Sequence, residues 1–286
     1  DYWICFNGEV YNYKEIKVEL SELGHQFNSS SDTEVVLHAY AEWGAKCLEK
    51  FIGMFAFVII QTKTNKLFCA RDRAGVKPFF YYVKDGLLMF SSELKSFHEH
   101  SRFDKKINQS AVAAFMQYGN VPSPHCIFDN CFKLKPGHYL EVILESETNI
   151  YNTLPKHQIE YWNVYNSYNK PKIDLSFDDA KKATESILID ACNYRMVSDV
   201  PVGVFLSGGY DSASVTALLQ KERTEKLNTF TISVPDIGLD EAPFAKEIAS
   251  YLGTNHTEIQ CTHKEAIDLI GDLPFYYDEP FGDSSA

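Results

Sequence analysis

In the first half of the chain, the spacing of apolar and polar positions predicts a β-rich core with helices packed on it. Apolar runs predict strands over residues 1–6, 53–60, 67–71, 79–81, 87–92 and 138–142. Apolar residues at helical spacing, with glycine stops at Gly24 and Gly44, predict helices over residues 14–23 and 32–43, and a shorter one over 110–118. This half is therefore predicted to be an α+β domain.

The pattern changes after a polar stretch. Residues 143–175 are rich in Asn, which predicts a surface excursion and linker with Tyr161-Trp162 as a packing anchor. From Ser176 a helix is predicted with an inward stripe of Ala180, Ala183, Ile187, Ala191 and Tyr194. Strands at 202–206, 228–234 and 256–260 then alternate with helices at 213–220, 241–252 and 264–270. Such alternation predicts a doubly wound parallel sheet, with ligands at the carboxyl ends of its strands.

Composition narrows the class of protein. The 286 residues, 45% of them hydrophobic, are enough for two domains with substantial cores. A net charge of −12 argues against a surface built for nucleic acid. Seven cysteines without a C-x-x-C pair predict neither a disulfide framework nor a zinc site, so we interpret them as reduced, mostly buried thiols of a cytoplasmic protein. No signal peptide or run of transmembrane length occurs, so no membrane partner is expected.

Both ends of the chain lack the signals of a domain boundary. The chain begins with Asp1 inside a predicted strand and without an initiator Met. It ends at Ala286 without the stop of a finished fold. We therefore expect it to be a fragment of a longer protein.

One short stretch carries the strongest chemical signal: Leu206-Ser207-Gly208-Gly209-Tyr210-Asp211-Ser212. The apolar run before it does not alternate, which predicts a strand buried on both faces of a parallel sheet. Backbone N–H groups and the positive end of the following helix converge at the two glycines, which leave room for a phosphate. The hydroxyls of Ser207 and Ser212 can donate to phosphate, and Asp211 fits there if it holds Mg²⁺. The alternative is a glycine turn in which Asp211 only caps the helix.

The same residues resemble the PP-loop, Ser-Gly-Gly-x-Asp-Ser, of enzymes that split ATP into AMP and pyrophosphate. No Gly-Lys-Ser/Thr ending of a Walker P-loop occurs here. The resemblance implies ATP and Mg²⁺ as cofactors, with Asp211 on the metal. The implied ATP and pyrophosphate site comprises Leu206, Ser207, Gly208, Gly209, Asp211, Ser212 and Ile232. Leu206 and Ile232 would flank the adenine and ribose, but core residues would look the same. Asp240-Glu241 is a helix start or, alternatively, a contact.

Two segments near the N-terminus are ambiguous when taken singly. Asn7-Gly8 is a turn signal, and Ser31 and Glu34 are spaced as a capping box that would place Asp32 in a first helical turn. Together, the motifs Asn-Gly-Glu-x-Tyr-Asn and Ser-Asp-Thr-Glu resemble the glutaminase domain of class II (N-terminal-nucleophile) amidotransferases. That resemblance predicts glutamine as a substrate.

The resemblance implies a role for four of these residues. Asn7 and Gly8 would be catalytic, because two donors must converge on the oxyanion of amide hydrolysis. Glu9 and Asp32 would hold the α-amino group of glutamine, so that glutamine binding involves all four. The family's nucleophile is an N-terminal cysteine, a position that this chain does not contain, and the mid-strand Cys5 cannot replace it. We therefore expect no glutaminase activity from this chain alone.

Two further segments resemble the same family. Arg71-Asp72 followed by Gly75 and Pro78 resembles its Arg-Asp-x-x-Gly-x-x-Pro segment, which we interpret as a paired Arg/Asp turn before a buried aromatic strand. Ser91-Ser92-Glu93 resembles its Ser-Ser-Glu strand end.

The order of the parts resembles glutamine-hydrolysing asparagine synthetase and related amidotransferases. It implies a class II glutamine amidotransferase domain over residues 1–165 and the start of a PP-loop synthetase domain over 166–286. The implied fold classes are an incomplete αββα sandwich of the N-terminal-nucleophile hydrolase type and an incomplete Rossmann-like parallel-sheet domain. The implied reaction amidates a carboxylate, normally aspartate, through an acyl-adenylate formed from Mg·ATP. Homodimerisation stays open.

Some residues depart from that family. Tyr210 fills a slot that usually holds a smaller aliphatic residue, and the ending Tyr277-Asp278-Glu279-Pro280-Phe281-Gly282-Asp283 differs from the Thr/Arg-rich version found near the acceptor in some asparagine synthetases. The acceptor is therefore aspartate or, alternatively, the carboxylate of a surface-polysaccharide sugar. A PP-loop tRNA-modifying enzyme and a non-catalytic remnant are further alternatives, of which the acidic charge opposes the first.

Overall fold

The computed structural model describes residues 2–144, 154, 157–235 and 240–283. The chain forms two compact units. The first unit comprises Asp1–Lys170 together with Pro274–Ala286, and the second unit comprises Pro171–Leu273. In the described residues no helix combines the length and the apolar character that crossing a bilayer requires.

A five-stranded antiparallel sheet forms the centre of the first unit. Its strands are β1 (Tyr2–Val10), β2 (Gly53–Gln61), β3 (Lys66–Arg71), β7 (His138–Ile143) and β8 (Ile159–Glu160), in the order β1-β2-β3-β7-β8. In this register Asn7 pairs with Ala56 and Gly8 with Phe55. A second sheet has the order β5-β4-β6, from β4 (Phe80–Lys84), β5 (Leu87–Ser91) and β6 (Cys131–Lys133).

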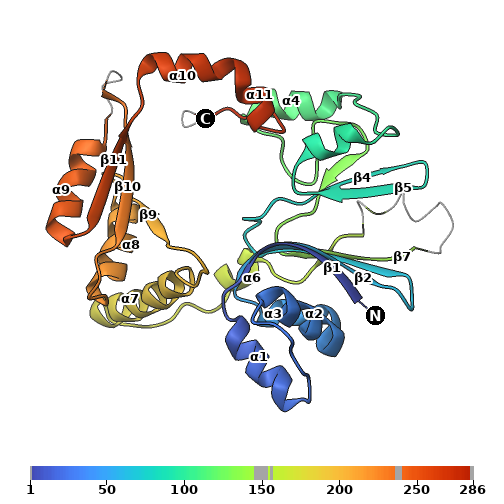
Figure 1. The fold of residues 1–286 in the computed structure, drawn as a ribbon, viewed down its shortest axis with the longest axis horizontal. Coiled ribbons are helices and arrows are strands. Elements are labelled where there is room, and N and C mark those ends of the chain that lie inside the picture. The colour runs from blue at the N-terminus through green and yellow to red at the C-terminus, as the bar shows by residue number, and fades with distance from the viewer. Residues whose placement is uncertain (1, 145–153, 155–156, 236–239, 284–286) are drawn as a thin grey trace. The chain divides into compact units, whose positions relative to one another are not determined.

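Helices cover the outer faces of the two sheets (Figure 1). On the five-stranded sheet lie α1 (Tyr13–Glu22), α2 (Asp32–Trp43), the short 3₁₀ helix η1 (Gly44–Lys46) and α3 (Cys47–Lys50). On the other sheet lie the 3₁₀ helix η2 (Leu94–Glu99) and α4 (Gln109–Tyr118). Three apolar cores separate the four layers: one contains Leu20 and Phe57, the next Val58 and Tyr81, and the third Tyr82.

Most predicted elements of the first unit are confirmed, with ends that differ by one or two residues. For example, the strand predicted over 67–71 is Lys66–Arg71, and the helix predicted over 14–23 is Tyr13–Glu22. The first strand is an exception, because β1 continues past its predicted end at Phe6 through Asn7-Gly8 to Val10, so the turn predicted at these two residues was wrong. The linker predicted over 143–175 contains β8 and a short helix, α6 (Val164–Tyr168), while residues 145–153 and 155–156 of it lie outside the described part. Tyr161 is an anchor, because its hydroxyl donates to the carbonyl of Arg71 at 2.8 Å.

The second unit alternates strands with helices. Its order is α7 (Phe177–Tyr194), β9 (Gly203–Phe205), α8 (Tyr210–Lys221), β10 (Asn228–Ser233), α9 (Ala242–Leu252), β11 (Asn255–Gln260), α10 (His263–Leu269) and η5 (Ile270–Asp272). The strands β9 and β11 both pair with β10 in parallel, in the order β11-β10-β9. The prediction of parallel strands alternating with helices is therefore confirmed for these elements.

Two predictions for the second unit were wrong. The strand before Ser207 was expected to be buried on both faces, but β9 lies at the edge of the three described strands and Phe205 is 82% exposed. The inward stripe of α7 was misplaced, since Ile187 is 67% exposed while Cys192 is buried against Leu219. Apolar residues on several faces of this helix permit more than one orientation, and packing on α8 selects the one that includes Cys192.

The cysteines follow the sequence prediction. All seven are free thiols, and five of them, Cys47, Cys69, Cys126, Cys131 and Cys192, are buried. Burial raises the pKa of the Cys69 thiol, because the apolar surroundings disfavour a thiolate. These five side chains therefore act as small apolar core residues.

Candidate functional site

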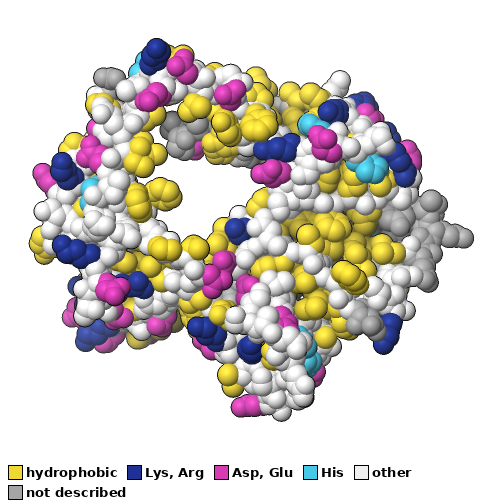
Figure 2. All heavy atoms as spheres, viewed as in Figure 1, with side chains coloured by type: hydrophobic (Ala, Val, Ile, Leu, Met, Phe, Trp, Pro, Cys, Tyr) yellow, Lys and Arg dark blue, Asp and Glu magenta, His cyan; other side chains and the backbone are white. Residues whose placement is uncertain are grey.

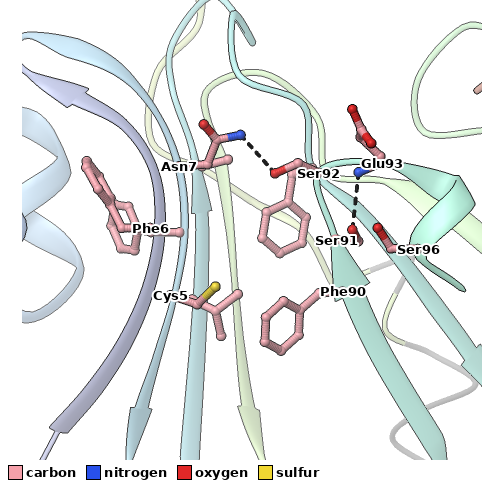
Figure 3. Close-up of a pocket in the computed structure, with 12 residues that line it drawn as sticks. Cys5, Phe6, Asn7, Phe90, Ser91, Ser92, Glu93 and Ser96 are labelled. Carbon is pink, nitrogen blue, oxygen red and sulfur yellow. Dashed lines mark hydrogen bonds between the residues drawn. The ribbon is translucent and has the colours of Figure 1, made fainter. Parts of the chain in front are cut away.

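Asn7 on β1 is joined to the second sheet by its side chain. Its Nδ2 donates to the hydroxyl of Ser92, directly after β5, at 2.8 Å (Figure 3). A cavity of about 420 Å³ lies between the two sheets at this point and is lined by Cys5, Asn7, Phe90 and Ser92 among others. Figure 2 shows hydrophobic side chains gathered in the hollow between these sheets. The bond to Ser92 fixes the rotation of the Asn7 amide at the edge of this cavity.

Gly8 occupies a position that no other residue fits. Its φ is +148°, and an added Cβ would lie 2.2 Å from the carbonyl oxygen of Met54 and 2.6 Å from the Cα of Phe55. Close approach of β2 thus excludes any side chain. The backbone beside Asn7 is therefore set by the packing of the strands.

Asp32 reaches the end of the same strand. Its Oδ2 accepts a hydrogen bond from the backbone N–H of Val10 at 2.9 Å, which places the carboxylate beside Glu9 in the chain. Asp32 is half-buried and Glu9 is exposed. Asn7, Gly8 and Glu9 thus lie near the end of β1. Asp32, the first residue of α2, is bonded to the same end of that strand.

The capping-box prediction was correct for Ser31 and wrong for Glu34. Ser31 is the N-cap and accepts from the N–H of Thr33 at 3.2 Å. Glu34 instead accepts from the N–H groups of Asn28 and Ser29, at 2.8 and 2.7 Å, because the preceding loop folds back over the helix start. These bonds lower the pKa of Glu34 to about 2.

The Arg71-Asp72 turn is not the ion pair that we expected. The carboxylate of buried Asp72 accepts four backbone N–H groups, those of Phe55, Ala74, Val76 and Lys77, at 2.9–3.2 Å. The guanidinium of Arg71 donates to three carbonyls, those of Gly75, Lys77 and Leu134, at 2.7–2.8 Å. Each charge is therefore satisfied by backbone, and this turn joins segments of the two sheets.

Ser92 is the partner that sequence reasoning did not assign. The Ser-Ser-Glu strand end was noticed, but nothing in its spacing connects it to Asn7, 85 residues earlier. The two sheets must pack before this pair exists.

The Ser207–Ser212 corner of the second unit is closed by its own side chains. The two hydroxyls lie 2.7 Å apart, and the Ser212 hydroxyl also accepts from the N–H of Ser207 at 3.1 Å. The N–H of Gly209 donates to the Ser207 hydroxyl at 3.2 Å. The corner sits at the carboxyl end of β9 and at the start of α8, as predicted.

Glu241 supplies an anionic oxygen to the same corner. Its Oε2 accepts from the N–H of Gly208 at 3.1 Å. The preceding Asp240 has the helix-start role, since it accepts from the Ser233 hydroxyl and from the N–H of Val234 and Ala242. The backbone of this corner therefore binds a carboxylate oxygen in the present conformation.

The remaining predicted residues of this corner differ in exposure. Leu206 is 2% exposed and packs against Ala245 and Ala249, so its side chain has a core role, whereas Ile232 is 58% exposed. Asp211 is exposed in the first turn of α8. Among the described residues no cluster of three or more His, Cys, Asp or Glu side chains could hold a metal.

Residues 1–153 match the family described as "Glutamine amidotransferase domain", and residues 183–286 match "Asparagine synthase". The boundary that we predict between residues 165 and 166 stays a prediction.

Curated relatives match along the whole chain. The chain is 38% identical to "Putative asparagine synthetase [glutamine-hydrolyzing] 2" of Methanocaldococcus jannaschii, over 100% of this chain and 53% of that protein. It is 33% identical to "Asparagine synthetase [glutamine-hydrolyzing] 3" of Bacillus subtilis, over 96% of this chain and 46% of that protein. The chain thus spans about half the length of the curated relatives it matches. Among solved structures, a glutamine phosphoribosylpyrophosphate amidotransferase from B. subtilis aligns with 90% of this chain and 45% of its own, at a TM-score of 0.38 and 16% identity.

Proposed function

Since the chain belongs to the glutamine-hydrolysing asparagine synthetase family, we propose that it takes part in the glutamine-dependent amidation of aspartate to asparagine. The observation that carries this proposal is the succession of a glutamine amidotransferase region and an asparagine synthase region in one chain. The four-layer first unit and the parallel strands of the second are compatible with an N-terminal-nucleophile hydrolase sandwich and a Rossmann-like PP-loop domain.

In the glutaminase half, Asn7 and Gly8 form the oxyanion hole. Negative charge develops on the amide oxygen of glutamine as the nucleophile adds, and two positioned donors stabilise it. The bond between Asn7 and Ser92 supports this role, because it holds the amide at the cavity edge before substrate arrives. Glu9 and Asp32 recognise the α-ammonium group.

In the synthetase half, the Ser207–Ser212 corner holds the pyrophosphate of ATP. The hydrogen bond from the N–H of Gly208 to Glu241 supports this role, because it places an anionic oxygen on the N–H group that would face phosphate. The residues present fit one Mg²⁺ held by Asp211 together with phosphate oxygens and water, the ligands that this ion prefers. When bound, Mg²⁺ would offset the charge of the phosphates.

A carboxylate must be activated before ammonia can displace its oxygen, because that oxygen is a poor leaving group. The side-chain carboxylate of aspartate attacks the α-phosphorus of ATP, the bond to pyrophosphate breaks, and an acyl-adenylate forms. Ammonia from glutamine then attacks the acyl carbon, AMP leaves with the bonding electron pair, and the nitrogen loses a proton. The Ser207–Ser212 corner orients the triphosphate and stabilises the departing charge.

The test uses full-length protein with glutamine, Mg·ATP and a carboxylate acceptor. We expect one asparagine and one AMP for each pyrophosphate released with aspartate, and no turnover with uronic acids. Asp211→Ala should lower amidation by about 10²-fold or more, as for the loss of one stabilising group at a developing charge. An undiminished rate in Asp211→Ala would overturn the assignment of the loop, and turnover of a uronic acid in place of aspartate would change the acceptor.

A further inference from the structure

A segment from the far end of the sequence is built into the first unit. Residues 275–282, here called the clasp, fall in the region that matches asparagine synthase, yet they pack with the first unit. The clasp begins inside the short helix α11 (Leu273–Tyr276). Its contacts involve two acidic side chains, the carbonyl and ring of Phe275, and the backbone of one glycine.

Asp278 holds the start of η2. Its Oδ2 accepts from the N–H of Leu94 at 2.7 Å, and its Oδ1 from the N–H of Lys95 at 3.2 Å. The local N-cap residue, Glu93, makes no side-chain cap bond of its own. The first two N–H groups of η2 are thus satisfied by a residue more than 180 positions away, which substitutes for a local cap.

Glu279 fastens the clasp at a second point. Its Oε1 accepts from the N–H of Ile127 at 2.8 Å, and its Oε2 forms an ion pair with Lys133. The two side chains are only 13% and 14% exposed. Each partner makes a further hydrogen bond. Removing one partner of an ion pair this well shielded from water would leave the other charge without compensation, which is destabilising.

Further contacts secure both ends of the clasp. The N–H of Gly282 donates to the carbonyl of Gly119 at 2.7 Å. Lys95 donates from Nζ to the carbonyl of Phe275 at 2.8 Å and lies over its ring at 5.2 Å from the centroid. The acidic pair therefore binds within a set of contacts that runs the whole length of the clasp.

The start of η2, which Asp278 caps, closely follows the residue that binds the Asn7 amide. Ser92, which accepts from the Asn7 amide at 2.8 Å, lies two residues before Leu94, and Ser96 of η2 lines the same cavity as Asn7. Between Asp278 and the Asn7 amide there are thus two hydrogen bonds and two residues of backbone. A change in the position of η2 would move the Ser92 hydroxyl with it.

We propose that Asp278 is a positioning residue for Asn7, acting through the start of η2 and Ser92. This inference rests on the proposed role of Asn7 in the oxyanion hole. A residue of the asparagine synthase region thereby sets the geometry of the glutamine site, so that glutamine hydrolysis depends on the state of the clasp. An oxyanion donor acts in the transition state, so its misplacement lowers kcat while leaving KM for glutamine nearly unchanged.

The test compares three variants of the full-length protein. Asp278→Ala removes the cap, Asp278→Asn keeps an oxygen acceptor, and Asp272→Ala is the matched control, an exposed acid six residues earlier. We expect about a tenfold lower kcat for glutamine hydrolysis in Asp278→Ala, below the ~10²-fold for loss of a donor itself. KM should stay within about twofold. Asp278→Asn should restore most of the rate, since Asn and Asp are comparable caps.

Two further measurements separate positioning from a loss of folded protein. Amidation driven by added ammonia bypasses glutamine, so Asp278→Ala should lower it severalfold less than it lowers glutamine-driven amidation. Hydrogen exchange at Leu94 and Lys95 should be faster in Asp278→Ala and unchanged in Asp272→Ala. In a Ser92→Ala background, Asp278→Ala should lower kcat by less than about twofold, because residues that act through one another are not additive.

The outcomes distinguish this inference from the proposed function. If wild-type protein does not hydrolyse glutamine, or Asn7→Ala leaves hydrolysis intact, the proposed function fails. If Asn7→Ala abolishes hydrolysis while Asp278→Ala keeps the wild-type kcat, only the inference fails. An equal loss of glutamine- and ammonia-driven amidation in Asp278→Ala, or additivity with Ser92→Ala, also overturns it.

Discussion

The two candidate anion-binding corners of this chain are built in opposite ways. The first, here called the Asn7 corner, comprises Asn7, Gly8 and Ser92 and is assembled from segments far apart in sequence. The Asn7 amide is fixed by Ser92, 85 residues away, and the backbone at Gly8 by the close approach of β2. The Ser207–Ser212 corner is assembled almost entirely from residues within five positions of each other. The first depends on the packing of two sheets, the second on local chain conformation.

This difference predicts different behaviour toward ligands. The Asn7 amide is anchored through one of its N–H groups at the edge of an existing cavity, so little rearrangement is needed when a substrate arrives. In the second corner the N–H groups of Ser207, Gly208 and Gly209 already donate to Ser212, Glu241 and Ser207. A pyrophosphate must displace these internal acceptors. Four substitutions or conditions test the contrast.

Gly8→Ala should have the largest effect. The added methyl group would overlap the Met54 carbonyl, so we expect a loss of about 3 kcal/mol or more in the free energy of unfolding. Gly24→Ala is the control, because Gly24 also has a positive φ but no atom within 4 Å of an added Cβ, and should cost about 1 kcal/mol. Urea unfolding of both variants measures the difference, and equal losses would contradict the steric account.

Ser92→Ala should lower the free energy of unfolding by about 1–1.5 kcal/mol, because the partly buried Asn7 amide loses its acceptor. Ser96→Ala is the control, because Ser96 lines the same cavity but is exposed. Its free energy of unfolding should stay within about 0.5 kcal/mol of wild type. Urea unfolding again provides the measurement. A neutral Ser92→Ala would mean that the long-range anchor contributes nothing to the first corner.

Glu241→Ala should strengthen binding at the second corner. It frees the N–H of Gly208 and removes a carboxylate, so we expect the Kd for Mg·pyrophosphate to fall about fivefold, corresponding to roughly 1 kcal/mol. Glu247→Ala is the control for net charge, because Glu247 is an exposed acidic residue on α9. Calorimetric titration distinguishes the two, and weaker binding in Glu241→Ala would show that the carboxylate assists the ligand.

Acidification should affect the first corner before the second. Burial lowers the pKa of His98 in η2 below 6.5, with Lys105 adding to the effect while Asp278 and Glu99 oppose it. A group that protonates less readily when folded destabilises the fold as pH falls below 6.5. Beside the second corner, hydrogen bonds lower the pKa of Asp240 below 3.8, so its contribution persists to lower pH. We expect lower hydrogen-exchange protection factors, which correct the measured rates for the pH dependence of intrinsic exchange, in residues 88–99 near pH 5.5, with a Tm decrease of about 1–2 °C.

His98→Gln provides the control, because it removes the titrating group from η2. The variant should show no change in the protection factors of residues 88–99 between pH 7 and 5.5. A simultaneous fall in the protection factors of residues 203–212 in the wild-type protein would contradict the separation of the two corners.

The contrast also explains what could be predicted from sequence. The strand and helix on either side of Gly208 are encoded in short stretches and were predicted, and their alternation predicted a parallel sheet without naming the neighbour of β9. The pairing of Asn7 with Ser92 and the capping of Leu94 by Asp278 were not, because no local pattern specifies which distant side chain will satisfy a given amide.

Local errors had a similar origin. Glu34 was expected to serve its own helix start, but a loop with free N–H groups lies nearer once the chain folds back. The faces of α7 and β9 were misjudged because apolar residues occur on more than one side of each, and tertiary packing decides which are covered.

The Arg71-Asp72 turn has a consequence for how the first unit responds to ionic strength. Opposite charges that neutralise each other across water are weakened by dissolved salt, whereas here each charge is met by peptide dipoles at 2.7–3.2 Å, and Asp72 is fully enclosed. Ions in solution have little access to such contacts. The contacts of this turn should therefore be equally stable at low and at high salt concentration. Lysine at position 71 would not replace the planar guanidinium, which donates to three carbonyls at once.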